Sequence, residues 1–272
     1  MALILKHADQ KGISWLGLIR VNYAAAAIIA FLLLVVRPPI SVSRSTLWVA
    51  ALAGVSYVAA LVIWSKAIQR SGIALTVGFT RISVIVPVLV SMLVWKEIPR
   101  WHQGLGIVLG IAAMLITGRA AAADPNPQTP RGRRFGGQVS LFALFAVSGV
   151  AALSSKLFQK LCPIQENLHF QTLLFVVAFM VATILYYIEK QRTGRVSLEL
   201  GAVLGGVNLG SSVFMVLALG LVSGTLAFPV SAAAEVAVIA VLGKVIWKER
   251  LDRLSIFGLV LTVISLLLVQ IP

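Results

Sequence analysis

The chain has 272 residues, of which 59% are hydrophobic and 12% charged, with a net charge of +14. A mean hydropathy of +0.98 and a charged fraction near half the usual ~25% exclude an ordinary soluble domain and predict a protein whose solvent is lipid. The basic residues are scattered singly between apolar runs, so the charge does not indicate a nucleic-acid partner.

A membrane-spanning helix needs about 20 predominantly apolar residues. Nine runs of about this length end at charged residues, proline or glycine. Lipid cannot satisfy exposed backbone groups, so each run predicts a helix. We therefore expect an all-α integral membrane protein with nine transmembrane helices. In chain order the runs are Leu16–Val36, Thr46–Ala67, Ile73–Trp95, His102–Gly118, Val139–Leu157, Leu168–Ile188, Leu198–Leu221, Thr225–Trp247 and Leu254–Ile271.

Residues 119–137 differ from the runs on either side. They contain the segment Asp124–Pro127 and the basic stretch Arg131–Arg134. Proline, glycine and charge are typical of a linker between two parts of a chain. The predicted organisation is a first repeat at 1–118, a linker at 119–137 and a second repeat at 138–272.

An internal repeat supports this division. Shifting the second half by 152 residues aligns it with the first half without gaps. Ser71–Gly72 then matches Ser223–Gly224, and Trp95–Glu97 matches Trp247–Glu249, so each copy has a Ser-Gly turn and a Trp-Lys-Glu helix end. We interpret the tryptophans mainly as anchors at the membrane edge.

The first copy is expected to lack its first helix. Under the same offset, the counterpart of Val139–Leu157 falls mostly before residue 1. The predicted plan is then ten helices lacking the first one, through truncation or a start codon chosen too far downstream. Five helices per copy would place the copies in opposite orientations, as two inverted helical repeats.

These motifs resemble those of the drug/metabolite transporter superfamily, in particular its EamA-type members with ten helices. The resemblance implies a secondary transporter of a small metabolite or amphiphile, working by alternating access in a bacterial inner membrane. Proton-coupled export of an amino acid or related metabolite is the specific expectation. The sequence departs from the pattern at Ile239, where the first copy has Pro87. The residues that carry the resemblance are Ser71–Gly72, Ser223–Gly224, Pro87, the two Trp-Lys-Glu ends, Gly106 and Gly258.

Two other classes of protein remain as alternatives: a membrane-embedded lipid flippase or enzyme, and a membrane subunit that does not transport. Enzymatic chemistry has little support, because the histidines lie near span ends or in loops and the sequence has no phosphate-binding loop or nucleophile elbow. We expect no catalytic residue, no metal site and no cofactor. The expected partners are a small-molecule substrate and the lipid bilayer.

Two charged residues lie deep in predicted spans. Glu235 is ten residues after Thr225, and Arg81 is eight residues after Ile73 on the repeat-equivalent helix. A charge near the bilayer centre is costly and normally faces a partner or a water-filled cavity. We predict that Arg81 binds an anionic group of the substrate and that Glu235 is its counter-ion or a protonatable coupling residue. The alternative is a structural ion pair.

Polar residues in other spans are further candidates for substrate binding. These are Asn22, Tyr57, Asn208 and Ser211, although such residues more often bridge helices. Two Gly-x-x-x-Gly motifs, Gly106–Gly110 and Gly206–Gly210, predict close helix contacts, with a homodimer interface as the alternative.

Overall fold

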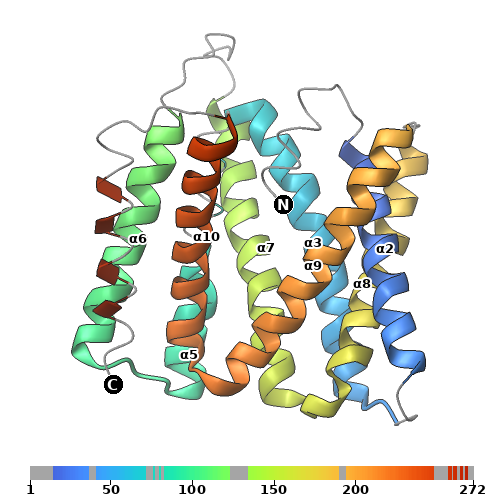
Figure 1. The fold of residues 1–272 in the computed structure, drawn as a ribbon, viewed down its shortest axis with the longest axis horizontal. Coiled ribbons are helices and arrows are strands. Elements are labelled where there is room, and N and C mark those ends of the chain that lie inside the picture. The colour runs from blue at the N-terminus through green and yellow to red at the C-terminus, as the bar shows by residue number, and fades with distance from the viewer. Residues whose placement is uncertain are drawn as a thin grey trace. The chain divides into compact units, whose positions relative to one another are not determined.

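The structure is a computed structural model that describes residues 15–36, 41–71, 76, 80, 83–122, 134–189, 194–247, 257–258, 260–261, 264–265 and 267–268. All regular secondary structure within these residues is helical (Figure 1). The all-α class predicted from the sequence is confirmed for this part of the chain. The named elements are α2 (Trp15–Val35), α3 (Arg44–Ser71), α5 (Ile85–Trp95), α6 (Trp101–Ala122), α7 (Arg134–Leu161), η1 (Ile164–Glu166), α8 (Asn167–Ile188), α9 (Arg195–Leu221) and α10 (Gly224–Trp247).

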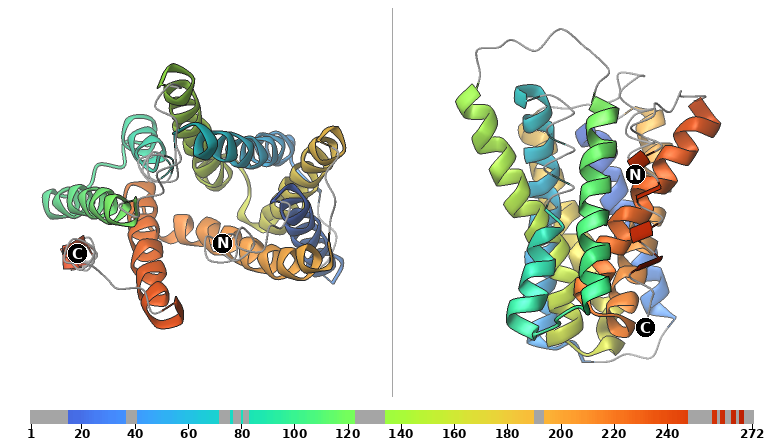
Figure 2. Two further views of the ribbon diagram at one scale, coloured as in Figure 1. Left: turned by 90° about the horizontal axis from the view of Figure 1, so that it is seen from above. Right: turned by 90° about the vertical axis from the view of Figure 1, so that its left-hand side faces the viewer.

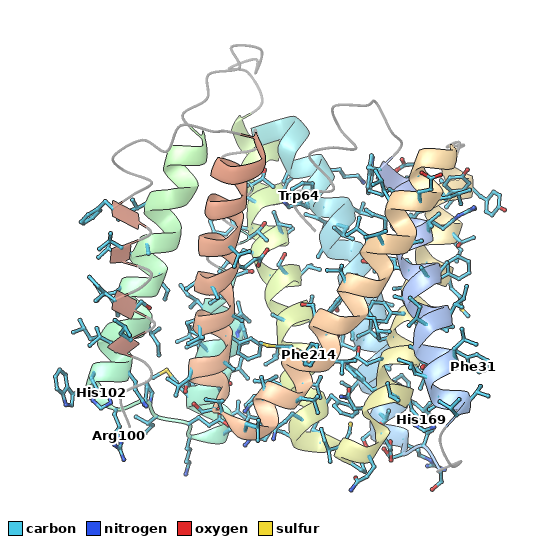
Figure 3. All side chains as sticks on the ribbon, in the orientation of Figure 1. Phe31, Trp64, Arg100, His102, His169 and Phe214 are labelled. Carbon is cyan, nitrogen blue, oxygen red and sulfur yellow. The ribbon has the colours of Figure 1, made fainter. Side chains whose placement is uncertain are left out.

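Five of the described helices are long and apolar enough to cross a membrane, and they coincide with five predicted spans. Each has at least 21 residues, so it rises about 31 Å and matches a hydrocarbon core about 30 Å thick. Large apolar side chains such as Phe31 on α2 point outward and are exposed (Figure 3), as a lipid-facing surface requires. The five spans are Trp15–Val35, Arg44–Trp64, Val139–Leu161, Ile164–Ile188 and Ser197–Leu221.

The other four predicted spans are described less completely. Two shorter apolar helices, Ile85–Trp95 and Trp101–Ala113, correspond to parts of the third and fourth spans. The eighth is α10, with 24 residues. In the ninth, Leu254–Ile271, every described residue is helical. The count of nine spans therefore stays a prediction.

The predicted span Ile73–Trp95 is interrupted by a turn at Ser83 and Val84, and α5 begins after it. Pro87 provides the physical reason, because it has no backbone N–H to donate to the carbonyl of Ser83. The amide of Val86 donates to that carbonyl instead, at 3.0 Å, which tightens the chain into a turn.

The start of α3 is held by the connection between α7 and α8. The buried carboxylate of Glu166 accepts hydrogen bonds from the backbone amide of Ser43 at 3.0 Å and from its hydroxyl at 2.8 Å. The Ser43 hydroxyl also accepts a long hydrogen bond from the amide of Thr46, at 3.4 Å. An acidic group at a helix N-terminus satisfies free amides and complements the helix dipole.

Backbone contacts divide the chain into two compact units. Unit 1 contains residues 1–59 and 153–221, and unit 2 contains residues 60–152 and 222–272. Each unit therefore combines segments from both predicted repeats. The repeat boundaries at 1–118 and 138–272 describe the sequence and stay a prediction, and the middle of the linker lies outside the described residues.

In unit 1, helix bounds recur at the repeat offset of 152 residues. Shifted by that offset, α2 would cover 167–187, and α8 covers 167–188. In the same way, α3 would become 196–223, and α9 covers 195–221. Equivalent helices run in opposite directions, with α2 descending and α8 ascending in Figure 1.

Glycines allow equivalent pairs of helices in unit 1 to pack closely. A Cβ atom on Gly205 of α9 would lie 2.6 Å from the backbone oxygen of Asn22 and 2.7 Å from the Cβ of Ala25. A Cβ atom on Gly54 of α3 would meet Leu174 and Val177 of α8, at 2.6 and 2.8 Å. Leu174 and Val177 are the repeat equivalents of Asn22 and Ala25. The glycines differ by one position, since the equivalent of Gly54 is Gly206, but both contacts use equivalent residues of α2 and α8.

One predicted glycine motif is confirmed and the other is wrong. In unit 2, a Cβ atom on Gly110 would lie 2.8 Å from the Ser265 hydroxyl, which donates to the Gly106 carbonyl at 2.7 Å. On α9 no atom lies within 4 Å of a Cβ built on Gly210, and Gly206 meets only the tip of Ile29 at 3.8 Å. The close contact with α2 uses Gly201 and Gly205 instead, which lie on a neighbouring face of α9.

Unit 2 is built around α10, which packs against α5 and α6 (Figure 2). A separate buried cluster joins Ala67 of α3 to Leu141 and Leu144 of α7. Ile63 and Trp64 pack against this cluster.

The close approach at Gly205 predicts a sharp difference between two glycines of one helix. Gly205→Ala should lower the free energy of unfolding by about 1–3 kcal/mol, because backbone atoms of α2 must shift. Gly210→Ala has open space and should change it by less than about 0.5 kcal/mol. Unfolding by SDS in mixed micelles measures both values. Equal effects of the two changes would contradict this packing.

Candidate functional site

Two asparagine side chains face each other between two spans of unit 1. The Asn22 side chain on α2 is only 1% exposed. Its Oδ1 accepts a hydrogen bond from Nδ2 of Asn208 on α9, at a long 3.5 Å. The Asn22 Nδ2 is buried and has no hydrogen-bond partner. This amide therefore retains the capacity to donate to another group.

Hydroxyl groups on α3 and α7 lie close to a serine of α9 that is one turn after Asn208. Ser212 follows Asn208 by four residues, which places both on one helix face. The hydroxyl of Tyr57 on α3 lies beside those of Ser212 and of Ser155 on α7. Ser212 is 5% exposed, and its hydroxyl is a hydrogen-bond partner of the Tyr57 hydroxyl. We call Asn22, Tyr57, Ser155, Asn208 and Ser212 the polar cluster.

Aromatic packing supports the cluster from one side. Tyr23 follows Asn22 on α2, is fully buried and lies near Tyr57. Its ring packs on Phe175 of α8 with centroids 6.2 Å apart. Phe175 is the repeat equivalent of Tyr23, so the two copies meet at this contact.

The two asparagines of the cluster have no asparagine at their repeat-equivalent positions. The equivalent of Asn22 is Leu174, and the equivalent of Asn208 is Ser56. The Ser56 hydroxyl donates to the carbonyl of Leu52 in its own helix, at 2.6 Å. The hydroxyl at this position is therefore satisfied within its own helix, whereas Asn22 Nδ2 of the cluster is unpaired.

A buried cation adjoins the cluster along α7. Lys156 follows Ser155 directly and is only 1% exposed, so its Cα lies about 3.8 Å from that of Ser155. Lys156 was not predicted as a site residue, because it lies at the end of the predicted span Val139–Leu157, where a lysine is usually an anchor at the membrane edge. The run Ser154–Lys156, three polar residues within an apolar span, was the available signal.

The structure brings together three of the six substrate-binding residues predicted from the sequence: Asn22, Tyr57 and Asn208. Ser211 is exposed, because neighbouring residues on a helix point about 100° apart, and Ser212 occupies the inner position instead. Glu235 is an exposed residue of α10. Arg81 lies outside the described residues, so its pairing with Glu235 stays a prediction.

Chemically, the cluster can bind a small polar group by hydrogen bonds. An unpaired buried donor or acceptor costs about 1–3 kcal/mol, so Asn22 Nδ2 favours a bound solute or water. The described residues contain no group of three or more potential metal ligands. Within this part of the chain, His102 and His169 lie at the starts of α6 and α8 (Figure 3).

These features define the chain as an integral membrane protein whose helical spans enclose hydrogen-bonding side chains. Residues 2–119 match the EamA-like transporter family. The match covers the first predicted repeat, and this part of the chain is similar to the EamA-type transporters of the drug/metabolite transporter superfamily.

Structural comparison agrees on the fold. A solved structure, described as the crystal structure of a protein, is similar with a TM-score of 0.78 over 98% of this chain and 92% of that chain. The sequence identity is 14%, so this likeness concerns the fold alone. No curated protein matches the sequence.

The amide pair predicts a small mutual stabilisation. In a double-mutant cycle with Asn22→Leu and Asn208→Leu, the coupling in the free energy of unfolding should be about 0.6 kcal/mol, since hydrogen bonds between membrane helices are weak on average. SDS titration of the four proteins measures it. A coupling above about 2 kcal/mol would indicate that the pair serves mainly to hold α2 and α9 together.

Proposed function

We propose that this protein is a secondary transporter that moves a small metabolite or amphiphile across the membrane by alternating access, with the polar cluster as part of the solute path. The observation that carries the proposal is the buried and unpaired Asn22 Nδ2 inside a membrane span, within a cluster of other polar side chains. Residues that only bridge helices would satisfy one another. Unpaired groups favour a site whose ligand comes and goes.

The repeat supports the alternating-access part of the proposal. Equivalent helices in unit 1 run antiparallel and pack through equivalent contacts. Transporters built from two inverted repeats bind their solute near the bilayer midplane, where the repeats meet. The contact between Tyr23 and Phe175 is such a meeting point, and Asn22 is adjacent to it.

The proposal includes coupling of transport to a proton gradient. Glu235 is the twelfth residue of α10, about 16 Å from the start of a helix of roughly twice that length. A carboxylate at this depth costs about 2.5 kcal/mol or more against lipid. We infer that Glu235 borders water and exchanges a proton during export of an amino acid or related metabolite, with Arg81 as its proposed partner.

Purified protein in liposomes tests the proposal against its rivals. A panel of radiolabelled metabolites, with and without a pH gradient, would reveal net flux. Movement of fluorescent lipids alone would identify a flippase, and lipid turnover would identify an enzyme. Binding without flux would identify a subunit that does not transport. The bacterial inner membrane is the proposed location, to be checked by membrane fractionation.

The cluster predicts which hydroxyl groups matter for transport. Tyr57→Phe and Ser212→Ala should each lower the transport rate at limiting solute about fivefold, the equivalent of one hydrogen bond of about 1 kcal/mol. Ser231→Ala is the matched control, because the Ser231 hydroxyl is exposed and donates to the carbonyl of Phe228 in its own helix. Wild-type rates for both cluster variants, at normal expression, would exclude the cluster from the solute path.

Removing the proton-carrying group should separate transport from its driving force. Glu235→Gln should abolish the stimulation of transport by a pH gradient, because an amide cannot carry the proton, while solute exchange without a gradient continues. Glu189→Gln, at the exposed end of α8, is the control. Full stimulation in Glu235→Gln would assign the coupling to another residue or another ion.

A further inference from the structure

The unpaired atom of the polar cluster is a hydrogen-bond donor, which restricts the chemical group that can bind there. Asn22 is 1% exposed, and its Nδ2 has no hydrogen-bond partner, whereas its Oδ1 already accepts from Asn208. An amide nitrogen can only donate. The group that completes this site is therefore an acceptor, such as a carboxylate or carbonyl oxygen, and an ammonium group does not fit.

The five side chains of the cluster are all neutral. Tyr57, Ser155 and Ser212 contribute hydroxyl groups, each of which can donate or accept. The cluster itself therefore has no carboxylate that would balance a cationic solute. Whether it favours a neutral or a charged group depends on the charged side chains nearby.

Among the described side chains of unit 1, two charged ones are buried, and they lie at different distances from the cluster. The carboxylate of Glu166 is bound by Ser43 at the start of α3. Tyr57 follows Ser43 by fourteen residues, about 20 Å further along α3. The other buried charge is Lys156, which follows Ser155 directly on α7.

The ammonium group of Lys156 is close to the cluster in every rotamer. Its Nζ extends at most about 6 Å from its Cα, which lies about 3.8 Å from the Cα of Ser155. The positive charge is therefore within about 10 Å of the Ser155 Cα. Lys156 is 1% exposed, and a buried charge is screened only weakly over such a distance.

We propose that the polar cluster binds the carboxylate of an organic acid, with Asn22 as a hydrogen-bond donor and Lys156 as the buried positive charge that favours an anion. The inference rests on the proposed transport function and narrows its solute to acids. The two oxygens of a carboxylate can accept from Asn22 Nδ2 and from a hydroxyl of the cluster at the same time. Lys156 acts through its charge at a distance.

Binding of matched solutes to the purified protein tests the class of solute. Phenylacetate, phenylacetamide and phenethylamine share one apolar body, and propionate, propionamide and propylamine share a smaller one. In thermal unfolding with increasing solute, at least one acid should stabilise the protein with a Kd at least tenfold below those of its amide and its amine. Equal binding of acid and amide, or tighter binding of the amine, would overturn the proposal.

The same titration isolates the contribution of the lysine. Lys156→Met should weaken binding of the acid about tenfold and leave binding of the amide unchanged, because only the acid is charged. Lys160→Met is the matched control, since Lys160 is an exposed lysine one turn further along α7. Equal losses for acid and amide in Lys156→Met would show a merely structural lysine.

A carboxylate placed in the cluster by mutation tests the charge without any solute. Asn22→Asp should raise the equilibrium constant for unfolding in SDS, and in Lys156→Met protein it should raise this constant about tenfold more, because the balancing charge is gone. Asn22→Leu is neutral and should have the same effect in both proteins. Equal effects of Asn22→Asp in both would overturn the role of Lys156.

Flux measurements separate the failure of this inference from the failure of the proposed function. Acids that bind but do not cross the liposome membrane would contradict transport and leave the acid site standing. Transport of amides or amines that acids do not inhibit would support transport and overturn the acid site. Where a variant does not fold, the solute series on the wild-type protein still decides the class of solute.

Discussion

The close approach of α2 to α9 at Gly205 is the contact on which the rest of unit 1 depends. It brings the backbone of Asn22 against a helix surface with no side chain, and Asn208 and Ser212 lie on the turns that follow. A larger residue at 205 would push α2 outward and separate the two asparagines, whose hydrogen bond is already long at 3.5 Å. In lipid, helices associate through such close packing, because the surrounding hydrocarbon is as apolar as their side chains.

The equivalent contact of α8 with Gly54 shows what the repeat has kept and what it has changed. The packing is kept, with Leu174 and Val177 in the places of Asn22 and Ala25. The polarity is changed, since an asparagine has become a leucine and an asparagine pair has no counterpart. Backbone packing is therefore shared by the two contacts, whereas the asparagine pair, one residue from each copy, occurs in only one of them.

Much of the fold was predictable because the length of an apolar run is set directly by bilayer thickness. The inner face of each helix was less predictable. In a soluble helix the apolar stripe marks the inside, but here both faces are apolar, so sequence periodicity did not distinguish Ser211 from Ser212. Lys156 was missed for a related reason: a lysine near a span end is usually an anchor at the interface, and only the packing of α7 shows that it is buried.

The asymmetry between the two copies has an energetic consequence. In the proposed alternating access, two identical inverted halves would make the outward-open and inward-open forms equivalent by a two-fold rotation, so the two forms would have equal free energy and equal populations. The pair of Asn22 with Asn208 has no mate at Leu174 and Ser56, so the two forms bury different amounts of unpaired polar surface. Under the proposed alternating access, the empty protein would therefore have a preferred resting orientation, and the solute would meet it mostly from one side of the membrane.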